Sequence, residues 1–229
     1  MITEPLTVAV IVPVYNEAAI AQAVADSLRS LMQSADIDVI VVDGTSSDGT
    51  ADTFRAAGLP VLDSRRGRAV QMNAGAKQTD ASVLVFLHAD TRLPDDAIAL
   101  VREAVTAGAV WGRFDIRIDG KSVWFPLIAA MINWRSRRGG HATGDQAIFV
   151  RRDAFESVGC FPDQPLMEDV EISRRLRKIR WPVCIAQPAI TSGRRWDTNG
   201  VWRTVFLMWR LRFAYWRGVP AEKLAALYA

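Results

Sequence analysis

Acidic side chains at the ends of short apolar runs are the residues of this sequence best suited to chemistry. Residues 82–87 form an apolar run that stops at His88-Ala89-Asp90, and residues 37–42 form another that stops at Asp43. Such runs are typical of strands buried on both faces of a parallel sheet. Open α/β sheets bind ligands at the carboxyl ends of these strands. A ligand site is therefore favoured over the simpler alternative that Asp90 only shapes a turn.

Asp90 and a nearby arginine loop together indicate a site for a metal ion and phosphate groups. Carboxylate and phosphate oxygens readily share the octahedral shell of Mg²⁺ or Mn²⁺, and Asp90 is the best candidate ligand. Arg65, Arg66 and Arg68 are suited to hold phosphate oxygens, although they would also fit a solvated surface cluster. Residues 13–17 contain no glycine, so the turn after the first apolar run disfavours NAD and FAD.

The first 110 residues alternate between strand and helix patterns, as in a parallel sheet wound in the right-handed sense. We expect strands at residues 8–14, 37–42, 59–62 and 82–87. Four helices are expected between and after these strands. The first is capped by Asn16 and carries an apolar stripe in residues 20–31. The others are expected at 47–58, at 69–77, and from a first turn that contains Pro94. This order brings residues 13–17, Asp43 and Asp90 to one edge of the sheet.

The second half of the chain follows a different pattern. Residues 110–118 alternate strictly, which predicts a half-exposed strand that is antiparallel or lies at a sheet edge. Three more segments are expected: an apolar helix or surface loop at 122–134 with a basic tip (Arg135, Arg137, Arg138), a strand at 146–150, and a helix opened by Glu168-Asp169. We expect one α/β domain over residues 1–229, in which 1–110 bind a cofactor-like group and 111–229 shape the substrate site.

The bulk properties are those of a globular protein, with 50% hydrophobic and 23% charged residues. A net charge of +3 fits an anionic ligand or a membrane surface and gives no reason to expect a nucleic acid partner. The first residues lack the basic start and cleavage site of an export signal, and the longest uncharged stretch, residues 122–134, is too short to span a bilayer. We expect a cytoplasmic protein, with contact to the inner face of the membrane as an option.

The C-terminal segment carries an aromatic face and an arginine face at helical spacing. The aromatic face consists of Trp202, Val205, Phe206, Trp209, Phe213 and Trp216, and the other face carries Arg203, Arg210 and Arg217. This combination resembles a helix lying in a bilayer interface. The alternatives are a homodimer formed through the aromatics and a helix packed on the sheet, with arginine stems over apolar surface. Arg212 falls between the two faces and fits neither arrangement fully.

Several short motifs, in this order, resemble family 2 glycosyltransferases of the GT-A fold. They are VPVYNE at 12–17, VDGTSSDGT at 42–50, RAVQMNAG at 68–75, HAD at 88–90 and ED at 168–169. The resemblance covers roughly residues 8–180 and implies a mostly parallel central sheet flanked by helices, with a smaller antiparallel portion on the acceptor side. The compact length and the segment 194–196 are most similar to small stand-alone bacterial members, including those linked to arsenosugar biosynthesis.

The resemblance implies a nucleotide-sugar site in the first half of the chain. Pro13, Tyr15 and Glu17 would line the nucleotide pocket. Asp43 would hydrogen-bond the base, typically uracil, and Arg68 would lie near the diphosphate.

The metal motif of the family is matched only in part. Asp90 matches the last aspartate of an Asp-x-Asp motif, and the first position is His88 here. This departure leaves three arrangements open: binding by the single Asp90 carboxylate, a water-filled shell, or ligation by His88.

The resemblance also implies roles in the second half of the chain. Asp169 matches the catalytic base at the start of a helix, with Glu168 beside it. The alternative is an acidic pair that merely complements the helix dipole. Arg195 and Trp196 are similar to a downstream Arg-Trp pair that contacts phosphate or acceptor.

These observations predict an inverting, Mn²⁺- or Mg²⁺-dependent glycosyltransferase with Asp169 as the general base. The donor would be a nucleotide sugar, in the first place a UDP-sugar, and the acceptor a hydroxyl of a small or lipid-linked molecule. Two alternatives stay open. One is a nucleotidyltransferase, which would need a glycine- and lysine-rich loop near the first strand; the other is a non-catalytic basic and aromatic module that binds membranes or nucleic acid.

Overall fold

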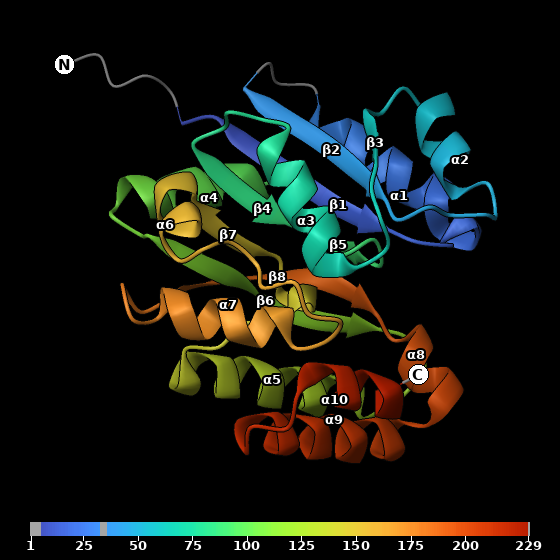
Figure 1. Cartoon of the computed structure of the whole chain (residues 1–229), viewed down its shortest axis with the longest axis vertical. Coiled ribbons are helices and arrows are strands. Elements are labelled where there is room, and N and C mark those ends of the chain that lie inside the picture. Colours follow the sequence, from blue (N-terminus) through green and yellow to red (C-terminus); the bar gives the residue numbers. More distant parts are fainter. Residues whose placement is uncertain (1–5, 33–35, 229) are drawn as a thin grey trace.

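The computed structural model describes residues 6–32 and 36–228, except for the side chain of Arg195. Within them, one eight-stranded sheet has the strand order β3-β2-β1-β4-β7-β6-β8-β5 (Figure 1). The strands are β1 (Val8–Val14), β2 (Ile37–Asp43), β3 (Val61–Asp63), β4 (Val83–Phe86), β5 (Thr91–Arg92), β6 (Trp111–Asp119), β7 (Ile148–Arg151) and β8 (Val183–Ser192). Strands β1 to β4 are parallel, whereas β7 is antiparallel to β4 and β6. The predicted mostly parallel sheet with an antiparallel portion is confirmed.

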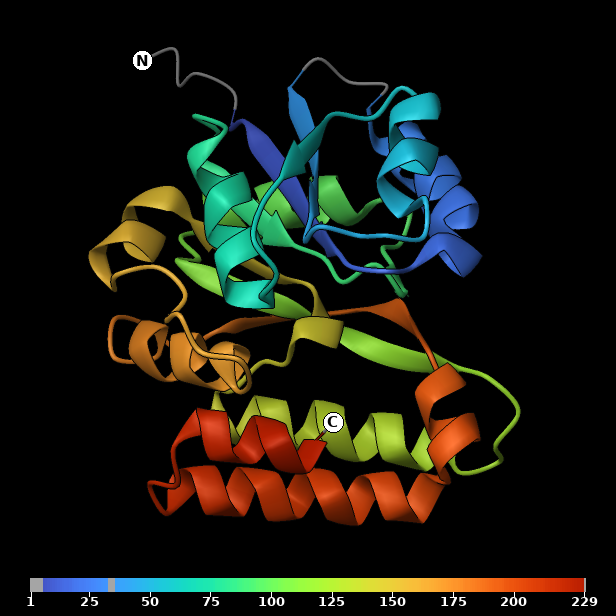
Figure 2. The ribbon, with the colours of Figure 1, turned by 45° about the vertical axis from the view of Figure 1, so that its right-hand side comes forward.

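Helices cover both faces of the sheet and form an additional layer beside it. They are α1 (Ala18–Leu31), α2 (Thr50–Ala56), α3 (Arg68–Lys77), α4 (Ala97–Thr106), α5 (Phe125–Gly139), α6 (Arg152–Ser157), α7 (Glu168–Leu176), α8 (Arg194–Asn199), α9 (Val201–Trp216) and α10 (Ala221–Tyr228). Helices α1, α2 and α4 share one hydrophobic core with the sheet, and α3, α6 and α7 share the other. Figure 2 shows α5, α9 and α10 side by side below the sheet.

The carboxyl ends of β1 and β2 are held together by a buried side chain of α3. Nε2 of Gln71 donates hydrogen bonds to the carbonyl oxygens of Val14 and Val42, each at 2.8 Å. Because both strands end where this amide binds them, the residues that follow them are fixed on the same edge. The predicted meeting of residues 13–17 with Asp43 at one edge follows from this parallel register.

Strand β6 has the antiparallel neighbour that was predicted as one option, but it is not an edge strand and its first half is not exposed. It lies inside the sheet, antiparallel to β7 and parallel to β8, and its first four residues are buried. Arg113, which the alternation placed on a polar face, is fully buried, where it pairs with Asp115 and donates to the carbonyl oxygen of Asn133 at 3.2 Å. Arg113 and Asp115 therefore face helix α5, whereas Arg117 further along the strand is exposed.

Helix α1 does not use Asn16 as its cap. Asn16 has a left-handed backbone (φ 51°), and its Oδ1 accepts the N–H of Ser47 at 3.0 Å. The N–H of Ala18 is instead accepted by Oδ2 of Asp48 at 3.0 Å. The capping group thus comes from a segment 30 residues away, which local sequence rules do not detect.

Several other predicted boundaries are displaced. Helix α4 begins at Ala97 rather than at Pro94, since Thr91 and Arg92 first pair with β8 as strand β5. Strands β3 and β7 each lie one to two residues later than predicted. The apolar segment at 122–134 is the body of α5, which continues through its basic residues to Gly139.

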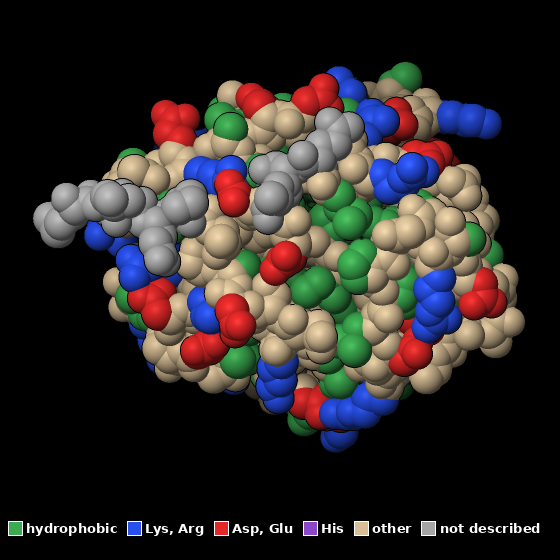
Figure 3. All heavy atoms as spheres, turned by 90° about the horizontal axis from the view of Figure 1, so that it is seen from above, with side chains coloured by type: hydrophobic (Ala, Val, Ile, Leu, Met, Phe, Trp, Pro, Cys, Tyr) green, Lys and Arg blue, Asp and Glu red, His purple; other side chains and the backbone are tan. Residues whose placement is uncertain are grey.

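The aromatic side chains of α9 lie on the surface. Val205 is buried, but Trp202, Phe206, Trp209, Phe213 and Trp216 are between 47% and 78% exposed. The alternative that these aromatics pack on the sheet is therefore wrong, while the membrane and dimer alternatives stay predictions. At the opposite end of the molecule, Figure 3 shows Lys, Arg, Asp and Glu side chains scattered over the surface, with a narrow hydrophobic band between them. None of the described helices combines the length and apolar character needed to cross a bilayer.

We expect Asp48→Asn to lower the melting temperature at neutral pH, because Asp48 also accepts hydrogen bonds from the backbone and hydroxyl of Thr50. The hydrogen bonds from Thr50 and Ala18 lower the pKa of Asp48 below its ordinary value of 3.8. A carboxylate whose pKa is lowered in the folded state stabilises the fold above its unfolded-state pKa, and this stabilisation is lost as the pH falls through the folded-state pKa. The difference in melting temperature between the variant and wild type should shrink below about pH 4. Asp80→Asn, at an exposed position, serves as the control; an equal loss there would contradict this account.

Candidate active site

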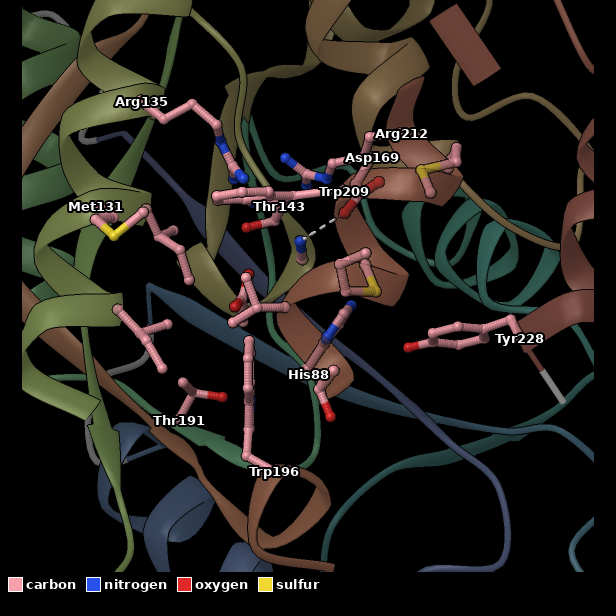
Figure 4. Close-up of a pocket in the computed structure, with 18 of the residues that line it drawn as sticks. His88, Met131, Arg135, Thr143, Asp169, Thr191, Trp196, Trp209, Arg212 and Tyr228 are labelled. Atoms are coloured by element: carbon pink, nitrogen blue, oxygen red, sulfur yellow. Dashed lines mark hydrogen bonds between the residues drawn. The ribbon is translucent and has the colours of Figure 1, made fainter. Parts of the chain in front are cut away.

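A cavity of about 490 Å³ lies between the carboxyl ends of the central strands and the layer of α5, α9 and α10 (Figure 4). Five predicted site residues line it: Arg68, His88, Asp90, Asp169 and Trp196. They come from α3, the segment after β4, α7 and α8, so the cavity joins the two halves of the chain. The structure thus brings these five residues to one cavity, and their roles stay predictions.

Asp169 is the cavity carboxylate with the most defined orientation. Its Oδ2 accepts the N–H of Gly144 at 3.0 Å, which Figure 4 shows as a dashed line, and its Oδ1 accepts the N–H of Val170 at 2.7 Å. Asp169 lies in the first turn of α7, where the positive end of the helix dipole favours a negative charge. A half-buried carboxylate fixed in this way can accept a proton from a group bound in the cavity.

His88 packs against the turn that holds Asp169. A Cβ atom placed on Gly144 would lie 2.0 Å from both Cε1 and Nε2 of His88, so only glycine fits beneath the ring. Burial and the Arg68 cation lower the pKa of His88 to about 3, against the opposing effect of Asp169. The imidazole is therefore neutral at pH 7.

Glu168 faces Arg68. Nε of Arg68 lies 3.1 Å from Oε1 of Glu168, whose side chain is 3% exposed. Burial, together with the Asp169 charge, raises the pKa of Glu168 against the effect of Arg68. Oε2 of Glu168 is buried and has no hydrogen-bond partner among the described residues. Glu168 thus orients Arg68, which itself lines the cavity, and Asp169 is the member of this acidic pair that lines the cavity.

Asp90 is the carboxylate best placed for a metal ion. Its side chain is reached by solvent through the cavity, and its pKa is raised by partial desolvation and by repulsion from Asp145 and Glu17. A divalent cation would relieve this repulsion. No group of three or more Asp, Glu, His or Cys side chains forms a ready ligand set in residues 6–32 and 36–228. The residues present therefore fit a cation held by Asp90 with further oxygens from water and a diphosphate.

A second set of predicted residues gathers at the ends of β1 and β2, outside the residues that line the cavity. Asp43 is 3% exposed, its Oδ2 accepts the N–H of Ser46 at 2.8 Å, and its buried Oδ1 has no partner in the described part of the chain. The guanidinium of Arg66 lies 4.2 Å from the centroid of the Tyr15 ring. Glu17 pairs with Arg194 at 3.0 Å, which ties α8 to this edge.

Two predicted residues have a different status. Pro13 is buried within β1, so it supports this edge from inside the sheet. The side chain of Arg195 lies outside the described residues, and its predicted role stays a prediction.

Sequence reasoning missed three charged residues of the cavity: Arg135 of α5, Asp145 and Arg212 of α9. Burial raises the pKa of the Asp145 carboxyl, and Asp169 adds to this while Thr143, Arg212 and Arg135 oppose it. The sequence did single out Arg212, because it falls between the aromatic face and the arginine face of its helix. Arg135 could not be separated from the other basic residues at the end of α5 by spacing alone.

The fold and the arrangement of carboxylates at strand ends define a glycosyltransferase of the GT-A type. The profile of "Glycosyl transferase family 2" matches residues 9–159, and the chain belongs to this family. Among curated relatives, the "Probable glycosyltransferase YdaM" of Bacillus subtilis is 23% identical over 92% of this chain. The chain spans about half of that relative, 54% of its length.

Two solved structures share the fold. The mannosyltransferase PcManGT of Pyrobaculum calidifontis, in complex with GDP-Man and Mn²⁺, has a TM-score of 0.65 at 22% identity, covering 90% of this chain and 60% of that one. Residues 1–349 of S. aureus TarS, in complex with UDP-GlcNAc, also give 0.65, at 16% identity, covering 81% and 58%. At these identities the likeness establishes the architecture.

We expect Gly144→Ala to disrupt the site, because its Cβ would overlap the His88 ring and shift the N–H that holds Asp169. Overpacking of this kind costs about 1–3 kcal/mol of unfolding free energy. Thermal and urea unfolding of the variant measure the loss. The double variant Gly144→Ala with His88→Ala should recover part of it, since the ring that causes the overlap is removed. Equal stability of the single variant and wild type would contradict the packing described here.

Proposed function

We propose that this family 2 glycosyltransferase transfers a sugar from a nucleotide sugar to an acceptor hydroxyl, with Asp169 as the general base. The observation that carries the proposal is the position of the Asp169 carboxylate. It is held by the N–H groups of Gly144 and Val170, and it lines the same cavity as Asp90 and Arg68. One cavity thus contains a proton acceptor and groups suited to a phosphate-bearing leaving group.

In the proposed reaction, Asp169 takes the proton of the acceptor hydroxyl as the hydroxyl oxygen attacks the anomeric carbon. The bond between that carbon and the diphosphate oxygen breaks, and its electron pair leaves with the nucleoside diphosphate. A single displacement inverts the configuration of the carbon. Glu168 is less suited to be the base, because its carboxylate is buried and faces Arg68.

The nucleotide is proposed to bind at the ends of β1 and β2, with its base against Asp43. The buried Oδ1 of Asp43 lacks a partner among the described residues and can accept a hydrogen bond from a base N–H. The Tyr15 ring, which stacks with the Arg66 guanidinium, offers an aromatic surface on which the base can lie. Uracil presents one such N–H, which makes a UDP-sugar the first donor to test; the similar structures were solved with GDP-Man and UDP-GlcNAc.

Mn²⁺ or Mg²⁺ is proposed to bind at Asp90, where it would neutralise charge on the departing diphosphate. The repulsion that raises the pKa of Asp90 supports a cation at this position. Arg68 lines the same cavity and is suited to hold a phosphate oxygen. In the proposed arrangement, His88 packs the turn of Gly144 as a neutral ring.

A thermal-shift screen tests the proposed function whatever the identity of the sugar. UDP, GDP and their sugars are added with and without Mn²⁺, and a ligand that binds the folded chain raises its melting temperature. We expect one nucleoside diphosphate to raise the melting temperature, and to do so more strongly when Mn²⁺ is present. If no nucleotide shifts the transition with either metal, the proposed donor class is wrong.

We expect Asp90→Asn to keep the fold and to abolish the Mn²⁺-dependent part of nucleoside diphosphate binding. The side chain lies at a strand end and contributes little to the core, whereas its charge is needed by the cation. Calorimetric titration with and without Mn²⁺ measures the effect. Asp95→Asn, another exposed acid a few residues further along, should bind as wild type does. Unchanged metal dependence in the Asp90 variant would remove Asp90 as the ligand.

We expect Asp169→Asn to reduce turnover by about 10²- to 10⁴-fold, the usual range for a lost general base. Donor binding should change little, because the donor contacts lie at Asp43 and Asp90. The matched variant Glu168→Gln should lose less turnover, since Glu168 acts through Arg68. The measurement is release of nucleoside diphosphate from the donor identified by thermal shift. A fully active Asp169 variant beside an inactive Glu168 variant would reverse the two roles.

A further inference from the structure

The cavity has two unlike walls. One carries Arg68, His88, Asp90 and Asp169, while the other, built by α5 and α9, is mostly apolar. The apolar wall consists of Leu127, Ile128, Met131 and Ile132 of α5 and Val205, Met208 and Trp209 of α9. A polar acceptor that presents only hydroxyl groups would not cover so much apolar surface. The wall therefore indicates a ligand with a hydrocarbon part.

The apolar wall continues from the cavity to the outer surface. Leu127, Met131 and Trp134 of α5 are 44% to 64% exposed although they also line the cavity. Trp202 and Trp209 of α9 also line the cavity, from the side opposite α5, and each is about half exposed. Beyond them lies the exposed aromatic face of α9, so a chain in the groove would emerge onto an apolar surface. An exposed apolar area of this kind marks a site of interaction.

Two arginines meet within this apolar part. Figure 4 shows Arg135 of α5 and Arg212 of α9 reaching toward the same place beside Trp209. Nε of Arg135 is buried without a hydrogen-bond partner in the described residues. Burial and the nearby Arg212 cation lower the pKa of Arg135 to about 10, although Asp145 and Asp169 oppose this. Two cations so placed are stabilised by an anion between them.

This pair lies on the acceptor side of the cavity. The donor contacts proposed above, Asp43 and Tyr15, are outside the residues that line the cavity, and Arg68 lies near Glu168 on α7. Arg135 and Arg212 instead come from the two helices that form the apolar groove. The donor diphosphate therefore does not account for them.

We propose that the acceptor is a lipid whose head carries both the reacting hydroxyl and a phosphate. The phosphate lies between Arg135 and Arg212, and the hydrocarbon tail follows the groove between α5 and α9. The tail emerges at the aromatic face of α9, from which a lipid surface can deliver it. This inference rests on the proposed function, because it names the acceptor of the same site. Beyond the proposed function, the inference specifies that the acceptor head is anionic and that its tail lies between α5 and α9.

The test uses dodecyl phosphate, below its micelle concentration, as a single-chain probe of the full protein. Binding is followed by tryptophan fluorescence, since Trp209 lies beside the arginine pair. Dodecanol supplies the tail without the charge, and inorganic phosphate supplies the charge without the tail. We expect both to bind roughly 10- to 100-fold more weakly than dodecyl phosphate, because each lacks one of the two contacts.

Arg135→Gln and Arg212→Gln should each weaken dodecyl phosphate binding by roughly 10- to 100-fold, the effect of losing one charged hydrogen bond. The matched controls are Arg138→Gln on α5 and Arg210→Gln on α9, two exposed arginines that do not line the cavity. They should bind the probe as wild type does. Equal losses in the controls, or equal binding of dodecanol, would overturn the proposal.

Two further readouts distinguish a lipid acceptor from a covered dimer face and from a failure of the donor chemistry. A homodimer that covers the aromatic face would double the mass in light scattering and exclude the probe, and this result would overturn the lipid acceptor. Nucleoside diphosphate binding with Mn²⁺ should be unchanged in both arginine variants. If nucleotide binds and dodecyl phosphate does not, the inference fails and the proposed function stands; if only dodecyl phosphate binds, the proposed donor chemistry fails instead.

Discussion

The contact between the His88 ring and the backbone of Gly144 is the constraint on which the site depends. It lets the segment after β4 approach the turn before β7 so closely that no side chain fits at position 144. The N–H of the same glycine then binds Asp169 at the start of α7. Three segments distant in sequence are thus fixed at one point, and the candidate base is oriented by backbone rather than by a mobile side chain.

This constraint also gives a physical reason for histidine at position 88. A carboxylate there would be buried close to Asp169, and burial beside a like charge would cost folding free energy. A neutral imidazole carries no charge into that space, and its flat ring packs on glycine. The first carboxylate of the Asp-x-Asp motif is replaced by His88, and Asp90, at the last position, is the acidic residue that remains. The repulsion on Asp90 comes from Asp145 and Glu17, which lie on other segments.

The sequence was informative where local pattern and burial agree. Residues 8–14 are apolar throughout and became β1 with unchanged bounds, because a central parallel strand is buried on both faces. It was misleading where tertiary contacts decide. Strict alternation in residues 110–118 is typical of a strand with a solvent-exposed face, but α5 covers the first part of that face and buries Arg113, and only Arg117 stays exposed there. The cap of α1 comes from Asp48, and no rule based on neighbours in sequence could find it.

The same distinction applies to the site. The residues at strand ends could be predicted because parallel strands bring their carboxyl ends to one edge. Arg135 and Arg212 of the cavity could not, since they lie on helices whose mutual placement depends on packing. That packing also links the two sides: Leu166 and Met167, directly before Glu168, share a hydrophobic cluster with Leu211 and Leu224 of the C-terminal helices. Arg212 follows Leu211, so the helix that bears this cation packs on the segment that leads into the candidate base, Asp169. A displacement of α9 would therefore be transmitted to the segment that bears Asp169 through these packed apolar side chains.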